Sequence, residues 1–298
     1  MGTEKRDRQR QGRQARLEQA RAAHQRKKRL RTARNFGIFA LLVVAALFAL
    51  SEIGGDDETE VETGTDTSTT VGDRSPEEPE GPAASILAEG ATITGETPCP
   101  PVDGSAERTT TFEALPPQCI DPTKSYTAVF DTSEGVVRVD LDAAATPITT
   151  NNFVVLSRYK YFDGTELFRT DPSIGIIQGG SPHTQDNSDP GPGYDLPDEG
   201  FDYAAIGGQG GPYSYGPGDL IMARSGRPDG ASAQFFFGVN DAVSGLDAQG
   251  VYVNFGETVE GLEVLEAILA LHEEDPSSGL GGGPRETVTI ETVTIEEG

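Results

Sequence analysis

The sequence predicts a β-dominated domain, closed into a barrel, over residues 123–298 of the 298-residue chain. Three observations favour this fold class. Short runs alternate apolar and polar residues with the two-residue period of half-buried strands. Glycine-rich turns separate these runs, and only two segments carry the spacing of an amphipathic helix. A domain of this size can bury a core of its own.

The first predicted strands form a β-hairpin. Residues 126–142 alternate apolar and polar side chains on both sides of residues 133–135, which supply the turn. The last strand, "TVTIETVTI", changes phase between Ile290 and Val293, which predicts a bulge or bend. The intervening strands are predicted from four apolar runs, "GIIQGG", "DLIMARS", "AQFFFGV" and "VYVNFG".

Two helices are predicted between these strands. Thr146 followed by Pro147 is typical of an N-cap and first helical turn, so a helix is expected from there to about Tyr159. A second helix is expected over residues 260–272, where three leucines share one face: Leu262, Leu265 and Leu269. Residues 181–219 consist almost entirely of loop-forming residues, and a loop of that length is usually functional or mobile.

Charge divides the chain into two regions of opposite sign. The first 34 residues carry a net charge of +10 and the remainder −35. Between them residues 36–50 contain no polar side chain and span roughly 22 Å as a helix, against about 30 Å for a bilayer core. We expect an uncleaved membrane anchor over residues 36–53, with a secretory signal peptide as the alternative.

The basic segment, residues 1–35, is expected to fix the orientation of that anchor. Lys and Arg flank the cytoplasmic side of membrane helices, so the chain after Ile53 is placed outside the cell membrane. Binding of RNA or anionic lipid, or a scaffold role for this tail, is the alternative. The segment has no aromatic residues on which bases could stack.

Residues 54–122 are acidic and poor in apolar residues, so we expect a flexible stalk. The chain's two cysteines, Cys99 and Cys119, lie near its end. In an oxidising exterior they are disulfide candidates, closing a loop of about twenty residues worth ~3 kcal/mol. Two free thiols are the alternative, and no third or fourth ligand accompanies them for a metal.

The sequence lacks the residue patterns of several common catalytic sites. The three histidines, His24, His183 and His272, lie far apart, which disfavours a zinc site or a Cys-His pair. No Gly-x-Ser-x-Gly motif supplies a serine nucleophile. The glycines of residues 181–219 precede neither a helix start nor a Lys-Ser/Thr pair, so a phosphate cradle is not expected. No cofactor and no metal are predicted.

Six motifs remain, and they occur together in the order and near the spacing found in one family. In that respect the chain resembles cyclophilins, the peptidyl-prolyl cis-trans isomerases, from about Tyr126 to Ile268. The anchor, stalk and cysteine-bearing lead-in resemble those of membrane-attached cyclophilins of actinobacteria. The motifs are "FDGTELFR", "IIQGG", "GPGYDLPDE", "YGPGDLIMA", "SAQFFF" and "NFGETVEGLEVLEAI".

The resemblance implies a closed eight-stranded antiparallel β-barrel capped by two α-helices, and rotation about X-Pro bonds as the activity. Arg169 matches the family's catalytic arginine. Its guanidinium is always charged and offers several donors in one plane. The alternative is a surface arginine paired with Asp171 or Glu166.

The resemblance also assigns a substrate-binding set to eight further residues. Two glutamines match those that hold the substrate backbone, with buried structural glutamines as the alternative. The apolar members match a proline pocket, with core packing as the alternative. A tyrosine hydroxyl is expected within reach of the substrate, with exposed packing as the alternative. The set is Gln178, Gln234, Phe236, Ile176, Leu246, Tyr252, Ala223 and Arg224.

Departures from the family pattern affect the expected efficiency more than the fold. Gly175 stands where phenylalanine is usual, with Ile174 as a candidate to fill the space. Gly245 replaces a tryptophan, so cyclosporin binding is expected to be weak. We therefore predict a membrane-tethered isomerase acting on proline-containing segments of exported proteins. A low-turnover proline-binding module or holdase chaperone is the alternative.

Overall fold

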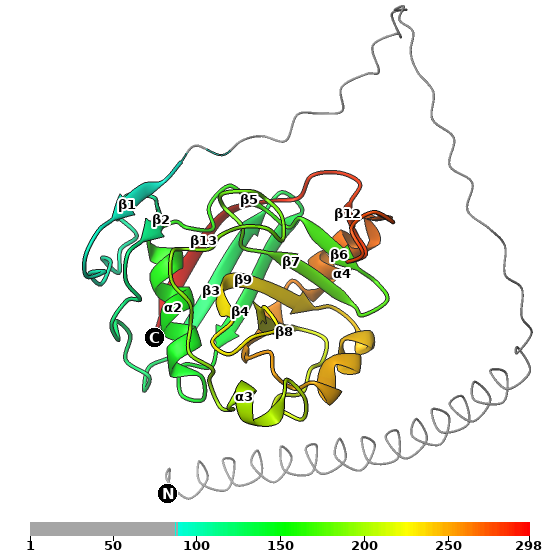
Figure 1. The fold of residues 1–298 in the computed structure, drawn as a ribbon. Helices are drawn as coiled ribbons and strands as arrows, with labels where there is room; N and C mark the ends of the chain where they lie inside the picture. The colour runs from blue at the N-terminus through cyan, green and yellow to red at the C-terminus, as the bar shows by residue number, and fades with distance from the viewer. Residues whose placement is uncertain (1–86, 88) are drawn as a thin grey trace, which may run out of the picture. The chain divides into compact units, whose positions relative to one another are not determined.

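The computed structural model describes residue 87 and residues 89–298, which form a curled antiparallel sheet with helices packed on it (Figure 1). In this part of the chain eleven strands follow the order β11-β12-β6-β7-β9-β8-β10-β4-β3-β13-β5, and β1 pairs in parallel with β2. The strands are β1 Ala91–Ile93, β2 Thr109–Phe112, β3 Tyr126–Thr132, β4 Gly135–Leu141, β5 Thr165–Glu166, β6 Arg169–Asp171, β7 Ile176–Gly179, β8 Asp219–Arg224, β9 Ala231–Gly238, β10 Asn254–Glu260, β11 His272–Glu274, β12 Gly282–Pro284 and β13 Thr289–Glu297.

The sheet differs from the predicted closed eight-stranded barrel. Three short segments, β5, β11 and β12, add pairs at its edges and leave eight longer or central strands. The order runs from β11 at one edge to β5 at the other, so the described sheet is a curled half-barrel. Segments of two or three residues carry no measurable alternation, and the sequence pattern therefore missed them.

The predicted hairpin and bulge are confirmed. Strands β3 and β4 pair from Tyr126 opposite Leu141 to Thr132 opposite Gly135, joined by two residues. In β13 the register shifts between Ile290 and Thr292, where the sequence changes phase. The shift keeps Ile290 and Val293 both buried although they are three residues apart.

Two helices pack on the sheet as predicted, α2 (Pro147–Arg158) beside β13 and β9, and α4 (Leu262–Ala270) beside β4 and β7. Helix α4 starts two residues later than expected because Gly261 adopts a left-handed conformation with φ of +90°. A single turn, α3 (Tyr203–Ile206), and a 3₁₀ helix, η1 (Asp241–Ala248), lie in the loops.

The start of α2 is capped from a distant loop. Thr146 occupies the N-cap position as predicted, but its hydroxyl donates to the carbonyl of Asp142 at 2.9 Å. The carboxylate of Glu199 instead accepts from the backbone N–H groups of Ile148 and Thr149, each at 2.9 Å. Glu199 is buried, and these two hydrogen bonds connect the long loop before β8 to the helix.

Two apolar clusters lie on opposite faces of the central strands. Alternate residues of β9 separate them, since Phe235 and Phe237 join the main core and Phe236 joins a smaller cluster. The main core also takes Ile177, Leu220 and Met222 from the neighbouring strands. This alternation follows from the two-residue period of a strand, and it leaves one face of the sheet available for a site.

The lead-in, residues 89–122, is packed rather than flexible. Cys99 and Cys119 form a disulfide, and Phe112 and Ile120 are buried in the main core. The side-chain oxygen of Asn151, on α2, accepts from the backbone N–H of Cys119 at 2.7 Å. The packed unit therefore begins before the predicted boundary at residue 122, because a few apolar residues and one disulfide anchor this segment of mostly polar composition.

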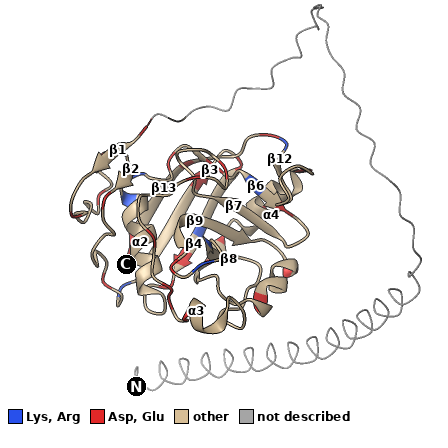
Figure 2. Ribbon diagram, in the orientation of Figure 1, with Lys and Arg blue, Asp and Glu red and all other residues tan. Residues whose placement is uncertain are grey.

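The predicted basic tail, residues 1–35, the anchor, residues 36–53, and the stalk up to residue 86 lie outside the described residues. Within residues 89–298 the helices are too short and too polar to span a bilayer. Acidic residues are spread along the helices, strands and loops, with few basic residues among them (Figure 2).

Candidate active site

A row of paired residues crosses the sheet on the face opposite the main core. Arg169 on β6 lies opposite Gln178 on β7, and Gln178 lies opposite Phe236 on β9. Ile221 on β8 continues the row beyond Phe236. Residues directly paired across strands share a face, and neighbouring strands are about 4.8 Å apart. The backbones of Arg169 and Phe236 are therefore separated by roughly 10 Å, with Gln178 between them.

The smaller apolar cluster lies at the Phe236 end of this row. Its enclosed members are Ile176, Tyr215, Ile221, Phe236 and Val243. Partly exposed residues pack around them and form the rim: Ile174, Tyr213, Ala223, Leu246 and Tyr252. The structure thus brings together the predicted residues Phe236, Ile176, Leu246, Ala223 and Tyr252 at one place.

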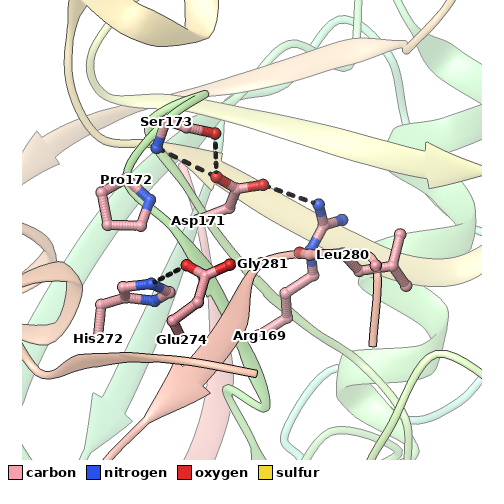
Figure 3. Close-up of a pocket in the computed structure, with 9 residues that line it drawn as sticks. Arg169, Asp171, Pro172, Ser173, His272, Glu274, Leu280 and Gly281 are labelled. Carbon is pink, nitrogen blue, oxygen red and sulfur yellow. Dashed lines mark hydrogen bonds and ion pairs between the residues drawn. The ribbon is translucent and has the colours of Figure 1, made fainter. Parts of the chain in front are cut away.

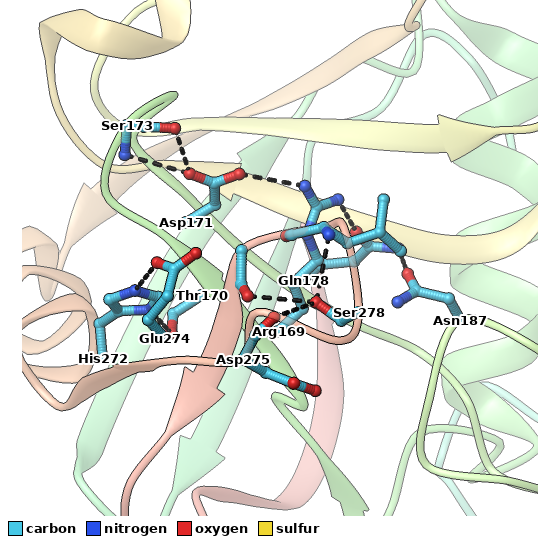
Figure 4. Close-up of polar contacts among 12 residues, drawn as sticks. Arg169, Thr170, Asp171, Ser173, Gln178, Asn187, His272, Glu274, Asp275 and Ser278 are labelled. Atoms are coloured by element: carbon cyan, nitrogen blue, oxygen red, sulfur yellow. Dashed lines mark hydrogen bonds and ion pairs between the residues drawn. The ribbon is translucent and has the colours of Figure 1, made fainter. Parts of the chain in front are cut away.

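Gln178 lies between Arg169 and the apolar cluster, and both atoms of its side-chain amide form hydrogen bonds. Its oxygen accepts from Nη1 of Arg169 at 2.9 Å. Its nitrogen donates to the side-chain oxygens of Gln234 at 2.8 Å and Asn187 at 3.1 Å (Figure 4). Because each group of the amide has a partner, Gln178 is held in one orientation and in turn orients Arg169.

Arg169 has two further partners on the side away from Phe236. Its Nη2 pairs with Asp171 at 3.2 Å, and its Nε donates to the carbonyl of Leu280 at 2.6 Å. The pairing with Asp171, considered from the sequence as an alternative, is thus present together with the contact to Gln178. The side chains of Arg169 and Asp171 are 15% and 12% exposed, so the cation lies in a partly enclosed environment.

A hollow of about 490 Å³ opens beside Arg169 and Asp171 (Figure 3). It is also lined by His272 and Glu274 of β11, whose side chains contact each other at 3.1 Å. Nδ1 of His272 contacts the hydroxyl of Thr170 at 2.8 Å, so both ring nitrogens have partners. Pro172, Ser173 and residues 279–281 complete the lining.

Tyr252 covers the ring of Phe236 edge-on, with centroids 5.7 Å apart. Its hydroxyl donates to the side-chain oxygen of Gln249 at 3.1 Å, and burial raises the pKa of that hydroxyl above its ordinary value. The hydroxyl therefore stays protonated at neutral pH, and its one proton is donated to Gln249.

The guanidinium of Arg224 is occupied within the protein. It pairs with Asp198 at 2.9 Å, lies 4.2 Å from the ring centroid of Tyr203 and 5.1 Å from that of Phe201, and is 4% exposed. These contacts stabilise the loop that contains α3. A role for Ala223 and Arg224 in substrate binding stays a prediction for their backbone groups.

Gly175 is required by its surroundings. It adopts φ of +67°, and an added Cβ would lie 2.4 Å from the side-chain oxygen of Asn240. Ile174 packs against the smaller cluster, as expected for the residue that fills the space left by the missing aromatic ring. Glycine therefore permits the turn between β6 and β7, and Ile174 packs on the cluster beside it.

The sequence did not identify several residues of the site. Tyr215, Ile221 and Val243 belong to the cluster, and Asn187 and Leu280 contact the polar row. The position of Ile221 could have been predicted from strand alternation, because it lies between Leu220 and Met222, whose side chains face the core. The others come from loops, where position depends on long-range packing that no local pattern predicts.

Comparisons with known proteins identify the family of this chain. A family model described as cyclophilin type peptidyl-prolyl cis-trans isomerase/CLD matches residues 127–295. A peptidyl-prolyl cis-trans isomerase of Synechococcus elongatus is 34% identical over 148 residues, covering 50% of this chain and 90% of the relative. The cyp18 isomerase of Streptomyces antibioticus is 31% identical over 176 residues, covering 57% and 98%.

A crystal structure of a Cryptosporidium parvum cyclophilin type isomerase matches with a TM-score of 0.46 and 23% identity, covering 58% of this chain and 98% of that one. The family match spans more than half of the chain. The chain therefore belongs to the cyclophilin-type peptidyl-prolyl cis-trans isomerases, a class of enzymes that interconvert the two isomers of X-Pro peptide bonds.

Proposed function

We propose that this isomerase accelerates X-Pro rotation by holding the twisted imide between Arg169 and the apolar cluster around Phe236. The barrier to rotation, ~18–20 kcal/mol, arises from amide resonance, so no nucleophile is needed. An enzyme lowers it by binding the twisted form better than either planar isomer. In the twisted form the imide nitrogen becomes pyramidal and accepts a hydrogen bond, which a guanidinium can donate.

The observation that carries this proposal is the row Arg169, Gln178, Phe236 on one face of the sheet. From one strand to the next across β6, β7 and β9, this row supplies a cation, an oriented amide and an apolar side chain. Arg169 has an enclosed side chain and two N–H groups beyond those already bonded to protein. Such preorganised donors stabilise developing charge without reorganising during the reaction.

The protein holds the substrate on both sides of the imide, by its proline ring and by its backbone. The proline ring packs at the rim formed by Leu246 and Tyr252 and against Phe236, where burial contributes ~1–2 kcal/mol. Gln234, whose side-chain oxygen accepts from Gln178 at 2.8 Å, holds the substrate backbone in this proposal. The residue before proline then swings while the ring stays fixed.

The setting we propose is the outer face of the cell membrane, with a single-pass anchor over residues 36–53 and a cytoplasmic N-terminus. Two observations support it. The basic segment precedes the apolar run, as in cytoplasm-facing flanks of membrane helices. The disulfide between Cys99 and Cys119 suits an oxidising compartment. X-Pro isomerisation takes tens of seconds unaided, so exported proteins are fitting substrates.

The test is isomerisation of an X-Pro peptide by the full chain in detergent, compared with Arg169→Ala. We expect wild type to accelerate the exchange and Arg169→Ala to lose at least tenfold in kcat/KM. If both are equally inactive while a proline peptide still binds, the chain is a binding module or holdase instead. The full chain is used because residues 89–122 are part of the folded unit.

A further inference from the structure

The guanidinium of Arg169 is fixed by three groups of the protein. Nε donates to the carbonyl of Leu280, Nη1 to Gln178 and Nη2 to Asp171, at 2.6, 2.9 and 3.2 Å (Figure 4). A guanidinium has five N–H groups. One N–H on Nη1 and one on Nη2 are therefore left for a substrate, and the three protein contacts define the plane in which both lie.

Asp171 is itself held in place. Its Oδ1 accepts from the backbone N–H of Ser173 at 3.1 Å and from the Ser173 hydroxyl at 2.6 Å, which leaves Oδ2 for Arg169. Asp171 lies two residues after Arg169 on β6, and both therefore face the same side of the sheet. The carboxylate is a rigid partner and not a mobile surface group, since its side chain is 12% exposed.

A second support comes from the turn of residues 275–281. The hydroxyl of Ser278 donates to the carbonyls of Asp275 and Gly281, and the backbone N–H of Asp275 donates to Gly281 at 3.0 Å. Gly281 lies against Asp171, because a Cβ at Gly281 would be 3.1 Å from the carboxyl carbon of Asp171. The turn thus presents the Leu280 carbonyl to Nε and closes behind the ion pair.

We propose that Asp171 is a positioning residue, which with the Leu280 carbonyl locks the plane of the Arg169 guanidinium toward the bound imide. This inference rests on the proposed role of Arg169. A long arginine side chain without such partners samples many rotamers, and a misplacement of about 1 Å can cost up to about 100-fold in rate. Asp171 also lowers the net charge of the site, which would slow the reaction if charge alone mattered.

Positioning of Arg169 by Asp171 would raise kcat, whereas the negative charge of Asp171 would lower it. Kinetic measurements therefore separate the two effects. Isomerisation by the full chain is measured as kcat and KM for Asp171→Ala, Asp171→Asn and the control Asp195→Asn. Asp195 forms an exposed pair with Arg227 outside the site. We expect Asp171→Ala to lower kcat about tenfold with KM within about twofold, because orientation acts in the transition state. Asparagine retains an acceptor for Nη2, so Asp171→Asn recovers to within about threefold of wild type.

A double variant distinguishes positioning from a structural effect. In the Arg169→Ala background, adding Asp171→Ala leaves kcat unchanged if Asp171 acts through Arg169, whereas a structural loss persists. If Asp171→Ala does not fold, Ser173→Ala removes one of the two hydrogen bonds to Oδ1 of Asp171 and is expected to lower kcat about threefold. Wild-type kcat in the folded Asp171 variant or, failing that, in Ser173→Ala overturns the positioning role.

Other outcomes separate this inference from the proposed function. A raised kcat in Asp171→Ala assigns the effect to charge and overturns positioning. An equal loss in the Ala and Asn variants also overturns positioning, because the acceptor that asparagine keeps for Nη2 would then have no effect. If Arg169→Ala keeps wild-type kcat, the proposed role of Arg169 fails, and positioning fails with it. If Arg169→Ala loses activity while the Asp171 variants do not, only the positioning role is rejected.

Discussion

Arg169 and Phe236 lie on the same face of the sheet, two strands apart, with Gln178 paired directly to both. The backbone register thus fixes the separation between the cation and the apolar cluster. The next residues along β9, Phe235 and Phe237, face the main core. Register and alternation together provide matched variants, because adjacent phenylalanines differ in the face that they occupy.

Phe236→Leu is expected to weaken activity while its neighbour Phe237→Leu does not. Both residues are at most 3% exposed, so each change is expected to cost about 1 kcal/mol of stability. Only Phe236 belongs to the cluster proposed to hold the proline ring. Loss of its aromatic contact is expected to lower kcat/KM about fivefold. Denaturant unfolding and peptide isomerisation check both values, and an equal loss of activity in the two variants would contradict the assignment.

Removing the disulfide is expected to affect stability without affecting catalysis. The double change Cys99→Ala and Cys119→Ala opens a loop with a sequence separation of 20 and is expected to lower the free energy of unfolding by about 3 kcal/mol. The lead-in contacts α2 and not the site row, so kcat/KM at 25 °C stays unchanged. Reductant supplies the control, since it should destabilise wild type alone. A loss of activity in the folded double variant would place the lead-in within the site.

Glu199→Gln is expected to destabilise the fold by about 1–3 kcal/mol. Both carboxylate oxygens accept from the first turn of α2, at 2.9 Å each. The amide keeps one acceptor but sets an NH₂ group against the second backbone N–H. Denaturant unfolding measures the loss, with the exposed Glu134→Gln as the control. Equal stability of the two variants would show that α2 does not depend on this cap.

Asp219 is expected to make stability depend on pH. Burial raises its pKa from 3.8 to about 6, although its carboxylate accepts from the backbone N–H of Gly216 at 2.7 Å. Between these two values the folded protein keeps a proton that the unfolded chain has released. Ionisation therefore lowers stability as pH rises from about 4 to about 6, and the full cost is present above about 6.

Unfolding of wild type and Asp219→Asn at several pH values measures that cost. The variant does not ionise, so its stability relative to wild type should rise by about 2 kcal/mol between pH 4 and pH 7. This value allows for the partial exposure of the group. A constant difference across the range would mean that Asp219 titrates normally in the folded protein.

The sequence predicted the parts of the fold that local patterns determine. The hairpin of β3 and β4, the bulge after Ile290 and both packed helices follow from alternation, turn residues and helical spacing. The edge pairs of β5, β11 and β12 and the ordering of residues 89–122 depend on long-range packing. For the same reason the cap on α2 came from Glu199 and not from the adjacent Thr146.

The strand residues of the candidate site were named from the sequence, and its loop residues were not. Arg169, Gln178 and Phe236 lie on neighbouring strands of the sheet, where resemblance to a family is a good guide to a residue's position. Arg224 lies next to a register shift, and its side chain turns to Asp198 and Tyr203. The contacts of Leu280 and Asn187 arise from turns whose backbone path the sequence does not specify.

The most direct test of the central claim is the interconversion rate of an X-Pro peptide bound to saturation, measured by exchange NMR for wild type and Arg169→Lys. Lysine keeps the positive charge but loses the planar set of donors. The account predicts at least a tenfold slower bound-state exchange, with peptide affinity within about threefold of wild type. A wild-type exchange rate in Arg169→Lys would contradict it.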